Sequence, residues 1–444
     1  MNHHHFLIIS FPIQGHINPI LQLSKNLARG GAKVTFATTV RGLRKLQHSL
    51  PSINNLSYAS FSDGHDQENN QSGGDFIAYM EDLRHIGAKN LTKLVQNFSE
   101  QGQPVTCLVY SLLLPWAASV ARGLHVPSAF LAIQSATVFA IYHSFFSNKS
   151  NSSELSISIP GLPFFSSSDL PTFLLPNNPM NSFMIPIMQE HMQELEKNPK
   201  PYVFLNTFQE LEQDSIEVFN NKLNAIPIGP LVPSAFYQEN DTTDKSFGGD
   251  LFIKSDDSNY FKWLDTKQEK SVIYLSFGSL VTINKDQKIE IMHGLLESKR
   301  PFMWVIRSSD HPEEDEVVIN NTRDIGIVVP WCSQIEVLNH KSIGCFVTHC
   351  GWNSTLESLI CGIPIIGFPH FSDQCTNAKM LEEVWGTGVR ARANGEVVVG
   401  REELKKCLDV VMGDTIGDEG KEMRRNAEKW RGLAMEAVRE VQPR

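Results

Sequence analysis

The chain has 444 residues, with 39 Lys and Arg against 49 Asp and Glu, a formal net charge of −10 and 41% hydrophobic residues. This length predicts two or three domains, each able to bury its own core. The negative charge argues against a protein that wraps nucleic acid or lies on anionic lipid, because basic patches hold both. We therefore expect a ligand that is recognised locally.

Cysteine use and hydropathy bear on the compartment. The seven cysteines include no CxxC pair, which predicts a reducing compartment with neither a disulfide framework nor a zinc site. Residues 126–146 form an uncharged stretch about long enough to span a bilayer, but Pro127 and several polar residues interrupt it. A buried strand and helix is the better interpretation. The short apolar run near the start is too brief for a signal peptide, so we expect a cytoplasmic protein without membrane insertion.

The first half of the chain alternates apolar runs with segments of helical spacing, a pattern that builds parallel sheets. The strands expected here cover residues 6–11, 33–38, 105–110, 128–131 and 202–206. Residues 144–181 are rich in Ser, Asn and Pro, and we expect loops and short helices there, over a cleft. Residues 233–258 mix Pro, Gly, Asp and Lys with little periodicity, which is typical of a linker.

A second α/β series follows the linker. Its expected strands cover residues 271–277, 302–306, 327–329, 345–348 and 364–368. The acidic cluster 310–316 contains Pro312, and we expect it to form a solvated loop. Residues 402–439 are charged and amphipathic, and we expect a helix whose charged face is exposed to solvent. We predict an α/β protein of two doubly wound domains facing each other, with ligands at the carboxyl ends of the strands.

The densest chemical signal runs from Trp331 to Gln374. An expected strand over 345–348 leads into His349-Cys350-Gly351, and Asn353 and Ser354 are residues that commonly begin a helix. Gly351 permits close approach of the backbone, and the free N–H groups of a helix start can hold an anion such as a diphosphate without a metal.

Three further side chains suit a nucleotide. His349 can add a hydrogen-bond donor, Glu357 has the acceptor geometry that a ribose diol needs, and Trp331 offers a flat face to a base. Singly, each has a plainer alternative: Trp331 in the core, His349 satisfied at a strand end, Glu357 on a helix surface. Their ordered occurrence in one segment favours the nucleotide interpretation.

The segment 331–374 resembles the signature box of plant secondary-product UDP-glycosyltransferases, and the resemblance extends to FPIQGHINP, VYSLLLPWAASVAR and SFGSL. It is most similar to the subgroup that includes crocetin, anthocyanin 5-O and plant-hormone glucosyltransferases. The resemblance implies the GT-B fold, two Rossmann-like domains facing across a cleft. The acceptor would bind to residues 1–232 and the UDP-sugar to 259–428, with 233–258 as linker and a C-terminal helix over 429–444 that packs back towards the first domain.

The resemblance also implies a role for each matching residue of the donor site. Trp331 would stack on uracil with Gln334 beside it, and Glu357 would hold the ribose. Cys332 would also belong to the UDP-sugar site. The residues implied to hold the diphosphate are Ser279, His349, Gly351, Asn353 and Ser354. The residues implied to hold the sugar hydroxyls are Trp352, Asp373 and Gln374. In such enzymes a glutamine at the end of the box goes with glucose rather than galactose.

The implied reaction is an inverting displacement without a covalent intermediate and without a metal. An acceptor oxygen attacks C1 of the α-linked glucose while UDP leaves. His16 would be the general base, and its alternative is a loop histidine that packs against a helix. The family usually pairs this histidine with an Asp, which orients and stabilises the imidazolium, but Ser111 stands at that position. Ser111 can accept a hydrogen bond but carries no charge.

The missing carboxylate matters least for an acceptor that is already ionised. A carboxylic acid with a pKa of roughly 4 to 5 is ionised at pH 7, whereas a simple phenol near 10 is not. We therefore expect a glucose ester or the glucoside of an acidic phenol as product. The alternatives are a flavonoid or anthocyanin O-glucosyltransferase without ester activity, and a catalytically weak binder of UDP-sugar. A Rossmann oxidoreductase is disfavoured because the first loop has no GxGxxG.

The expected acceptor lining is mostly apolar and aromatic, which suits a flat aromatic or polyene acceptor. Its residues are Ile13, Gln14, Gly15, Gln134, Phe183, His370 and Phe371. Phe371 stands where the family often has Trp. Relatives usually continue past the point where this sequence stops, at Arg444, so we expect a shortened C-terminus. We expect a monomer.

Overall fold

The computed structural model describes residues 4–46, 49–67, 76–147, 156–220, 222–236, 259–307, 312–393, 398–413 and 417–440. The chain divides into two compact units, Met1–Leu251 with Ala437–Arg444, and Phe252–Glu436. The division at 251 falls within the expected linker 233–258. Residues 237–258 of that linker lie outside the described residues, so the linker and the domain limits drawn around it stay predictions.

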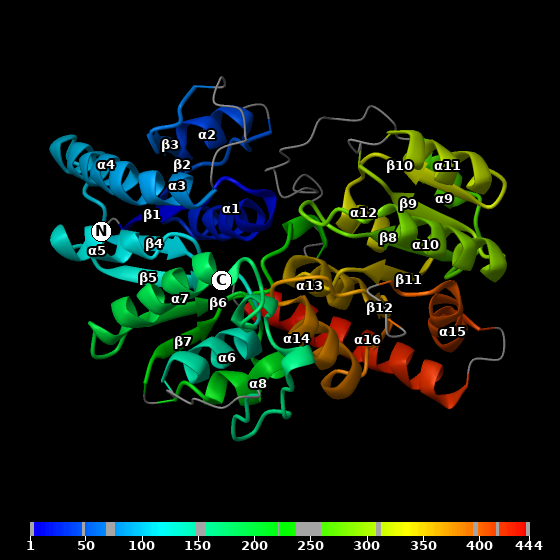
Figure 1. Ribbon diagram of the computed structural model, residues 1–444. Coiled ribbons are helices and arrows are strands. Elements are labelled where there is room, and N and C mark those ends of the chain that lie inside the picture. The colour runs from blue at the N-terminus through cyan, green and yellow to red at the C-terminus, as the bar shows by residue number, and fades with distance from the viewer. Residues whose placement is uncertain are drawn as a thin grey trace. The chain divides into compact units, whose positions relative to one another are not determined.

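The first unit is built on a seven-stranded sheet in the order β3-β2-β1-β4-β5-β6-β7, in which every neighbouring pair is parallel (Figure 1). Its strands are β1 His5–Ile9, β2 Lys33–Thr39, β3 Leu56–Phe61, β4 Cys107–Ser111, β5 Ser128–Ala132, β6 Tyr202–Leu205 and β7 Asn224–Pro227. The central strands are nearly continuous apolar runs, because helices bury both of their faces.

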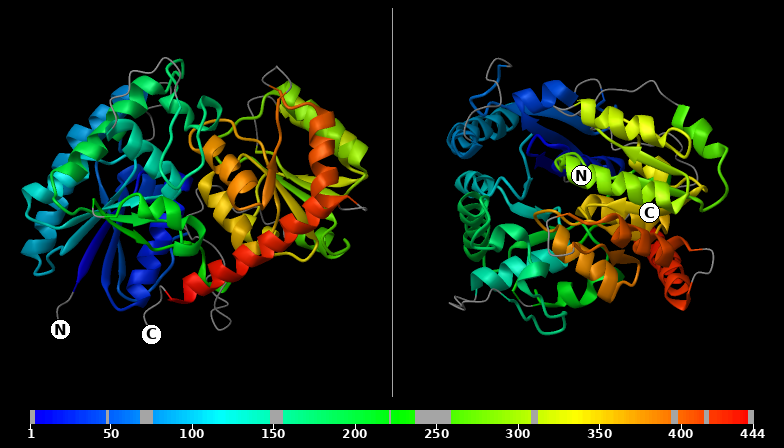
Figure 2. Two further views of the ribbon diagram at one scale, coloured as in Figure 1. Left: turned by 90° about the horizontal axis from the view of Figure 1, so that it is seen from below. Right: turned by 45° about the vertical axis from the view of Figure 1, so that its right-hand side comes forward.

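The helices of the first unit cover both faces of this sheet (Figure 2). They are α1 Gln14–Arg29, α2 Val40–Leu46, α3 Phe76–Asp82, α4 Ala88–Glu100, α5 Trp116–Gly123, α6 Ala136–Ser147, α7 Asn181–Glu196 and α8 Gln209–Glu217. In the register of β1 against β4, Ile8 lies opposite Val109. The ends of these two strands therefore meet at one edge of the sheet, where the loop after β1 leads into α1.

The second unit repeats the plan with a six-stranded parallel sheet in the order β10-β9-β8-β11-β12-β13. Its strands are β8 Val272–Ser276, β9 Phe302–Val305, β10 Gly326–Val329, β11 Ile343–Thr348, β12 Ile365–Gly367 and β13 Gly388–Arg390. Its helices are α9 Asn259–Asp265, α10 Lys285–Ser298, α11 Pro312–Thr322, α12 Gln334–Leu338, α13 Trp352–Cys361, α14 Gln374–Lys379, α15 Arg401–Met412 and α16 Asp418–Glu440. Two Rossmann-like units with parallel sheets confirm the predicted fold class.

The structure corrects the interpretation of the acidic cluster 310–316. Residues 312–316 begin helix α11 rather than lying in a solvated loop, and Pro312 suits the first helical position, where its missing N–H costs nothing. Asp315 is buried and accepts a hydrogen bond from the Lys288 ammonium of α10 at 2.6 Å. Part of this cluster therefore packs against a neighbouring helix. Asp310 and His311 lie outside the described residues.

The stretch 126–146 contains strand β5 and most of helix α6, as expected from its interrupting polar residues. Across the described ranges, no helix is both long enough and apolar enough to cross a membrane. Residues 156–181 form an isolated bridge between Ile157 and Phe165 and short 3₁₀ turns, Ser167–Asp169 and Thr172–Leu174. This agrees with the expected loops and short helices.

Candidate active site

The loop between β11 and α13 forms the centre of the predicted donor site. β11 ends at Thr348, and α13 begins at Trp352 with Gly351 as its N-cap. Cys350 has a φ of 63°, an unusual conformation for a residue with a side chain, and its buried carbonyl accepts a hydrogen bond from the Asn377 amide at 3.0 Å. The chain therefore turns sharply enough for a helix N-terminus, with its free N–H groups, to follow the strand directly.

The His349 imidazole lies between the backbones of two glycines. A Cβ atom on Gly278 would lie 2.6 Å from its Cε1 and Nε2 atoms, and one on Gly351 would lie 2.5 Å from Nε2. Burial lowers the pKa of His349 to about 3, with smaller contributions from His370 and Arg307. The ring is therefore neutral at physiological pH, so it can donate one hydrogen bond to a phosphate oxygen but brings no charge.

Gln334, at the start of α12, connects the parts predicted to hold the nucleoside. Its Nε2 atom donates to the Ser354 hydroxyl at 2.9 Å and to Oε2 of Glu357 at 2.7 Å. The Tyr274 hydroxyl of β8 approaches Oε1 of Gln334 at 3.5 Å and the Cys332 sulfur at 3.2 Å. Glu357 is buried, and the hydrogen bond from Gln334 helps to satisfy its carboxylate.

The two tryptophans of the signature segment have different surroundings. Trp331 is half-buried, as a ring must be if a base is to stack on it. Trp352 is buried, and its ring lies 5.9 Å from that of Trp385. Its position at the first turn of α13 presents a backbone N–H group at the helix start, whereas a role of its side chain towards sugar hydroxyls stays a prediction.

The residues at the end of the segment form a pair of opposite hydrogen-bonding character. Oδ2 of Asp373 accepts a bond from the Asn377 amide at 2.8 Å. Oε1 of Gln374 accepts from the backbone N–H groups of His370 and Phe371, at 2.8 and 3.1 Å. Within the described residues the Gln374 amide nitrogen makes no hydrogen bond, so Gln374 can act only as a donor to a ligand, while Asp373 is an acceptor.

His370 and Phe371, predicted for the acceptor, lie in the second unit next to Gln374. Nδ1 of His370 donates to the Phe368 carbonyl at 2.6 Å. Because a carbonyl can only accept, Nδ1 carries the proton in the neutral ring and Nε2 is left as an acceptor. Burial lowers the pKa of His370, which favours this neutral form. Phe371 is exposed.

In the first unit, His16 is the third residue of α1 and Ser111 is the last residue of β4. His16 is 7% exposed and Ser111 is fully buried. Among the described residues, neither Nδ1 of His16 nor the Ser111 hydroxyl has a hydrogen-bond partner. The bond that Ser111 could accept is therefore not made. Burial alone lowers the pKa of His16 to about 3, so its ring is neutral.

An aromatic series extends from His16. The Phe11 ring lies 5.8 Å from His16 and 6.3 Å from Tyr79, and Phe76 lies 6.2 Å from Tyr79 and 4.9 Å from Phe183. Phe183 comes from α7, so the series joins three segments that are distant in sequence. We call Phe11, Tyr79, Phe76 and Phe183 the aromatic series.

The other predicted acceptor residues lie at the same edge of the first sheet. Ile13 is the N-cap of α1, and Gln14 donates to the Asn18 side chain at 2.8 Å. A Cβ atom on Gly15 would meet no described atom within 4 Å, so this glycine faces open space. Gln134 follows β5 and accepts a bond from the Tyr142 hydroxyl at 3.3 Å.

The predicted residues thus gather at the carboxyl ends of the strands within each unit. Every donor residue lies in the loops after β8, β10, β11 and β12 or in the helices that follow them, and most of the others lie at the ends of β1, β4 and β5 or in the segments that follow. Three supporting residues were not predicted: Tyr274, Asn377 and Arg307, whose guanidinium donates to the Ser279 carbonyl. Of the three, only Arg307 could have been suspected from the sequence, because it closely follows an expected strand.

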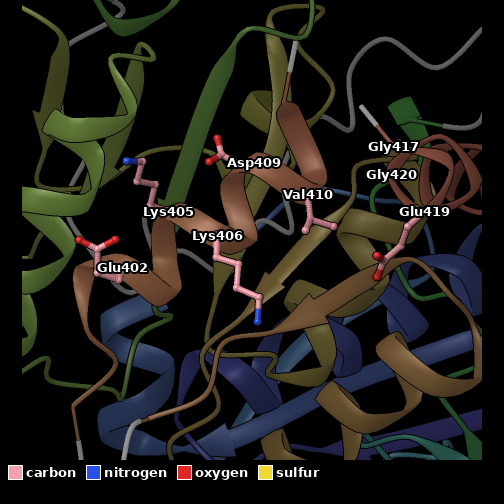
Figure 3. Close-up of a pocket in the computed structure, with 8 residues that line it drawn as sticks. All are labelled: Glu402, Lys405, Lys406, Asp409, Val410, Gly417, Glu419 and Gly420. Carbon is pink, nitrogen blue, oxygen red and sulfur yellow. The ribbon is translucent and has the colours of Figure 1, made fainter. Parts of the chain in front are cut away.

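A separate pocket of about 460 Å³ lies between α15 and the start of α16 (Figure 3). It contains none of the predicted site residues. Figure 3 shows its charged side chains, of both signs, pointing in different directions rather than at one point. Its lining residues are Glu402, Lys405, Lys406, Asp409, Val410, Gly417, Glu419 and Gly420. Across the described residues, no group of three or more His, Cys, Asp or Glu side chains is arranged to hold a metal ion.

Comparison with known proteins is consistent with this geometry. Residues 245–421 match the family model described as UDP-glucoronosyl and UDP-glucosyl transferase. The chain is 47% identical to the chloroplastic crocetin glucosyltransferase of Gardenia jasminoides, over 98% of this chain and 94% of that protein. It is 47% identical to phloretin 4'-O-glucosyltransferase of Malus domestica, over 99% and 95%. The crystal structure of Os79 from O. sativa in complex with UDP matches with a TM-score of 0.87 and 30% identity, over 98% of each chain.

Proposed function

The chain belongs to the plant secondary-product UDP-glycosyltransferase family and is a glycosyltransferase, and from this premise we propose that it glucosylates an acidic small molecule. The donor is UDP-glucose. The acceptor is a carboxyl or phenolic oxygen of a small plant metabolite or hormone. The product is a β-glucose ester or β-O-glucoside. The unpartnered state of Nδ1 of His16 and of the Ser111 hydroxyl is the observation that carries this choice of acceptor.

The donor assignment rests on the arrangement around α13. The helix start and neutral His349 offer hydrogen-bond donors to a diphosphate, and Glu357, held by Gln334, offers an acceptor to a ribose diol. Asp373 and Gln374 offer an acceptor and a donor to sugar hydroxyls. The relatives are named glucosyltransferases, which favours glucose as the sugar. No metal is assigned a role.

The choice of acceptor follows from what orients His16. In a histidine and aspartate pair, the carboxylate accepts a hydrogen bond from the ring nitrogen that faces it and fixes the proton there. The other ring nitrogen is left as the base, and the carboxylate stabilises the imidazolium. Here the buried Nδ1 has no such partner among the described residues. Protonating His16 would create an uncompensated buried cation, consistent with a pKa of about 3. His16 is thus a weak base and an adequate hydrogen-bond donor.

An ionised acceptor avoids this step. A carboxylate oxygen attacks C1 of glucose, the bond from C1 to the UDP oxygen breaks, and UDP leaves with the electron pair. No proton has to be removed. A neutral phenol must lose its proton during the attack. A general base usually contributes about 10²–10⁴-fold to the rate of such a step, and His16 contributes less because it is a weak base. With Ser111 in place of Asp, the pocket around His16 is also less negative, which suits an incoming carboxylate.

The test is a panel of carboxylic acids, acidic phenols and neutral phenols incubated with UDP-glucose, with UDP release and product mass as readouts. Mild alkali cleaves glucose esters and leaves phenolic glucosides intact. We expect alkali-labile products, and only alkali-stable products from such a mixed panel would contradict the ester proposal. UDP-glucose binding without UDP release for any acceptor would identify a catalytically weak binder instead.

Ser111→Asp sharpens this test, and Ser111→Asn is its matched control, of similar size without the charge. Supplying the carboxylate should raise rates with neutral phenols on the order of tenfold and change rates with carboxylates little. A larger gain for carboxylates would refute the proposed role of Ser111. Thermal midpoints of both variants show whether the buried change disturbs folding.

A second candidate is glucosylation of phenols alone. The aromatic series beside His16 favours it, because flat rings would pack against Phe11 and Phe76. The relative named phloretin 4'-O-glucosyltransferase points the same way. The alkali test separates the two candidates directly.

We also propose a monomer in the cytoplasm, although the Gardenia relative is named chloroplastic. Light scattering after gel filtration tests the first, and a fluorescent fusion of the full chain in plant cells tests the second.

A further inference from the structure

Arg307 is a half-buried arginine at the carboxyl end of β9, and no role was predicted for it. Its guanidinium donates one hydrogen bond to the carbonyl of Ser279 and another, at 3.1 Å, to the carbonyl of Val281. Both carbonyls belong to the loop between β8 and α10. One rigid, planar group therefore holds two points of this loop, which a flexible lysine ammonium could not do with the same geometry.

The loop that Arg307 holds lies against His349. Gly278 has a φ of +73°, and a Cβ atom there would overlap the imidazole. Ser279, the next residue, is the one predicted to contact the diphosphate. A displacement of this loop would therefore move the Ser279 backbone and one wall of the His349 site together.

The charge of Arg307 also acts on His349. Burial lowers the pKa of Arg307, yet a guanidinium remains protonated in proteins. Its charge is one of the causes that lower the pKa of His349, after burial and His370. The cation thus lies within electrostatic range of the ring, in a site where His349 itself is neutral.

We propose that Arg307 is a positioning residue for the diphosphate of the donor: it fixes the loop of Gly278 and Ser279 against His349, and its charge favours the bound and leaving diphosphate. This inference rests on the proposed function, because it assumes that the site binds UDP. Arg307 acts through the loop, and no direct contact with the ligand is required.

The test compares Arg307→Met and Arg307→Lys with the intact enzyme by calorimetric titration of UDP and of uridine. Uridine lacks the diphosphate, so a defect confined to the phosphate region changes the ratio of the two affinities. The control is Arg392→Met, also in the second unit. The Arg392 side chain is 62% exposed, and its guanidinium pairs with Glu382 at 2.6 Å. Thermal midpoints are measured for all variants.

For Arg307→Met we expect UDP affinity to fall about tenfold, the effect of losing hydrogen bonds from a charged group, while uridine affinity stays within about twofold. Arg307→Lys keeps the charge but not the fork, and should give an intermediate loss. If Arg307→Met does not fold, the UDP and uridine affinities of Arg307→Lys test the proposal. Arg392→Met should leave both affinities unchanged.

Equal losses for UDP and uridine, or no loss for either, would overturn the proposal, because a general packing defect does not distinguish the ligands. Failure of the unmodified enzyme to bind UDP would instead refute the proposed function. The two failures are therefore distinguishable.

Discussion

The two predicted reaction regions each place a histidine at the carboxyl edge of a parallel sheet, but they satisfy their buried polar atoms differently. Around His349, Gln334 bonds to Ser354 and Glu357, and Asn377 bonds to Asp373 and Cys350. Around His16, the imidazole Nδ1 and the Ser111 hydroxyl have no partner among the described residues.

This difference indicates that the two regions obtain their order in different ways. The donor side chains hold one another in place before any ligand binds, as a site with a fixed ligand should. The region around His16 has unused hydrogen-bonding capacity, so under the proposed function we expect its behaviour to depend more on the charge state of the acceptor. Four substitutions and a change of pH can break or sharpen this comparison.

The largest effect is expected for His16→Ala. Rates with neutral phenol acceptors should fall by about 10²-fold, the low end of the usual contribution of a general base, because His16 lacks a carboxylate partner. Rates with carboxylic acids should fall less, because those acceptors are already ionised. Initial rates with UDP-glucose and one acceptor of each kind measure this, and His125→Ala, at an exposed position, is the control. Equal losses for both acceptors would show that His16 does not act as a base.

Gln334→Ala tests the self-supporting donor side. It removes hydrogen bonds to Ser354 and to the buried Glu357 carboxylate, so UDP affinity should fall about 10- to 100-fold by titration calorimetry. The matched control is Gln213→Ala, an exposed glutamine that bonds to Glu217 at 2.9 Å. Unchanged UDP affinity would mean that Glu357 does not need this support.

Acid should destabilise the first unit through its buried neutral histidines. The pKa of His16 is lowered to about 3 and that of His191 to about 4, mainly by burial. The neutral rings contribute their full share to the free energy of unfolding above about pH 6.5, the ordinary pKa of histidine. That share is lost as the pH falls towards the pKa values in the folded protein, at about 1.4 kcal/mol per histidine and pH unit. We expect the thermal midpoint to drop between pH 7 and 5.

His191→Phe should flatten that pH dependence, whereas substitution of exposed His125 should not. His191 packs against Tyr110 and Phe130, with ring centroids 5.9 and 4.6 Å away, so a phenylalanine keeps these ring contacts. It loses the hydrogen bond to the Leu112 carbonyl, so the comparison is of the slope with pH and not of the absolute stability. A parallel acid response in this variant and the unmodified protein would exclude His191 as a cause.

The smallest effect is expected for Ser111→Ala. Because the hydroxyl makes no hydrogen bond among the described residues, its removal should change stability by less than about 0.5 kcal/mol and leave carboxylate rates unaltered. Denaturation curves and initial rates measure this. A loss above about 1 kcal/mol would reveal a hydrogen bond of Ser111 in solution.

The sequence predicted the central strands better than the edges. The strands that it missed, β3, β7 and β13, all lie at the edge of a sheet. An edge strand is partly exposed and need not be apolar, as Leu56–Phe61 with its serines illustrates. Apolar runs identify strands that are buried on both faces, so they cannot identify these.

The roles of the candidate site residues stay predictions. A few residues of the signature segment could be interpreted from their order in the sequence, and the remaining roles came only from the resemblance to the glycosyltransferase family. Tyr274 of β8 and Asn377 of α14 bond to that segment, whereas Arg307, which follows β9, bonds to the loop after β8. Only tertiary packing brings such groups together, and the sequence has no periodicity that records it. That Nδ1 of His16 and the Ser111 hydroxyl have no partner among the described residues likewise depends on tertiary packing.

The two glycines beside His349 limit how this protein can vary. A methyl group at Gly278 or Gly351 would overlap the imidazole, so these positions tolerate no other residue unless the histidine also changes. In a library of random variants selected for activity, both should remain glycine while neighbouring exposed Leu280 accepts many substitutions. Few substitutions near His349 are therefore compatible with a change of donor. The region around His16 has polar atoms without partners among the described residues, so substitutions there can change the acceptor more easily.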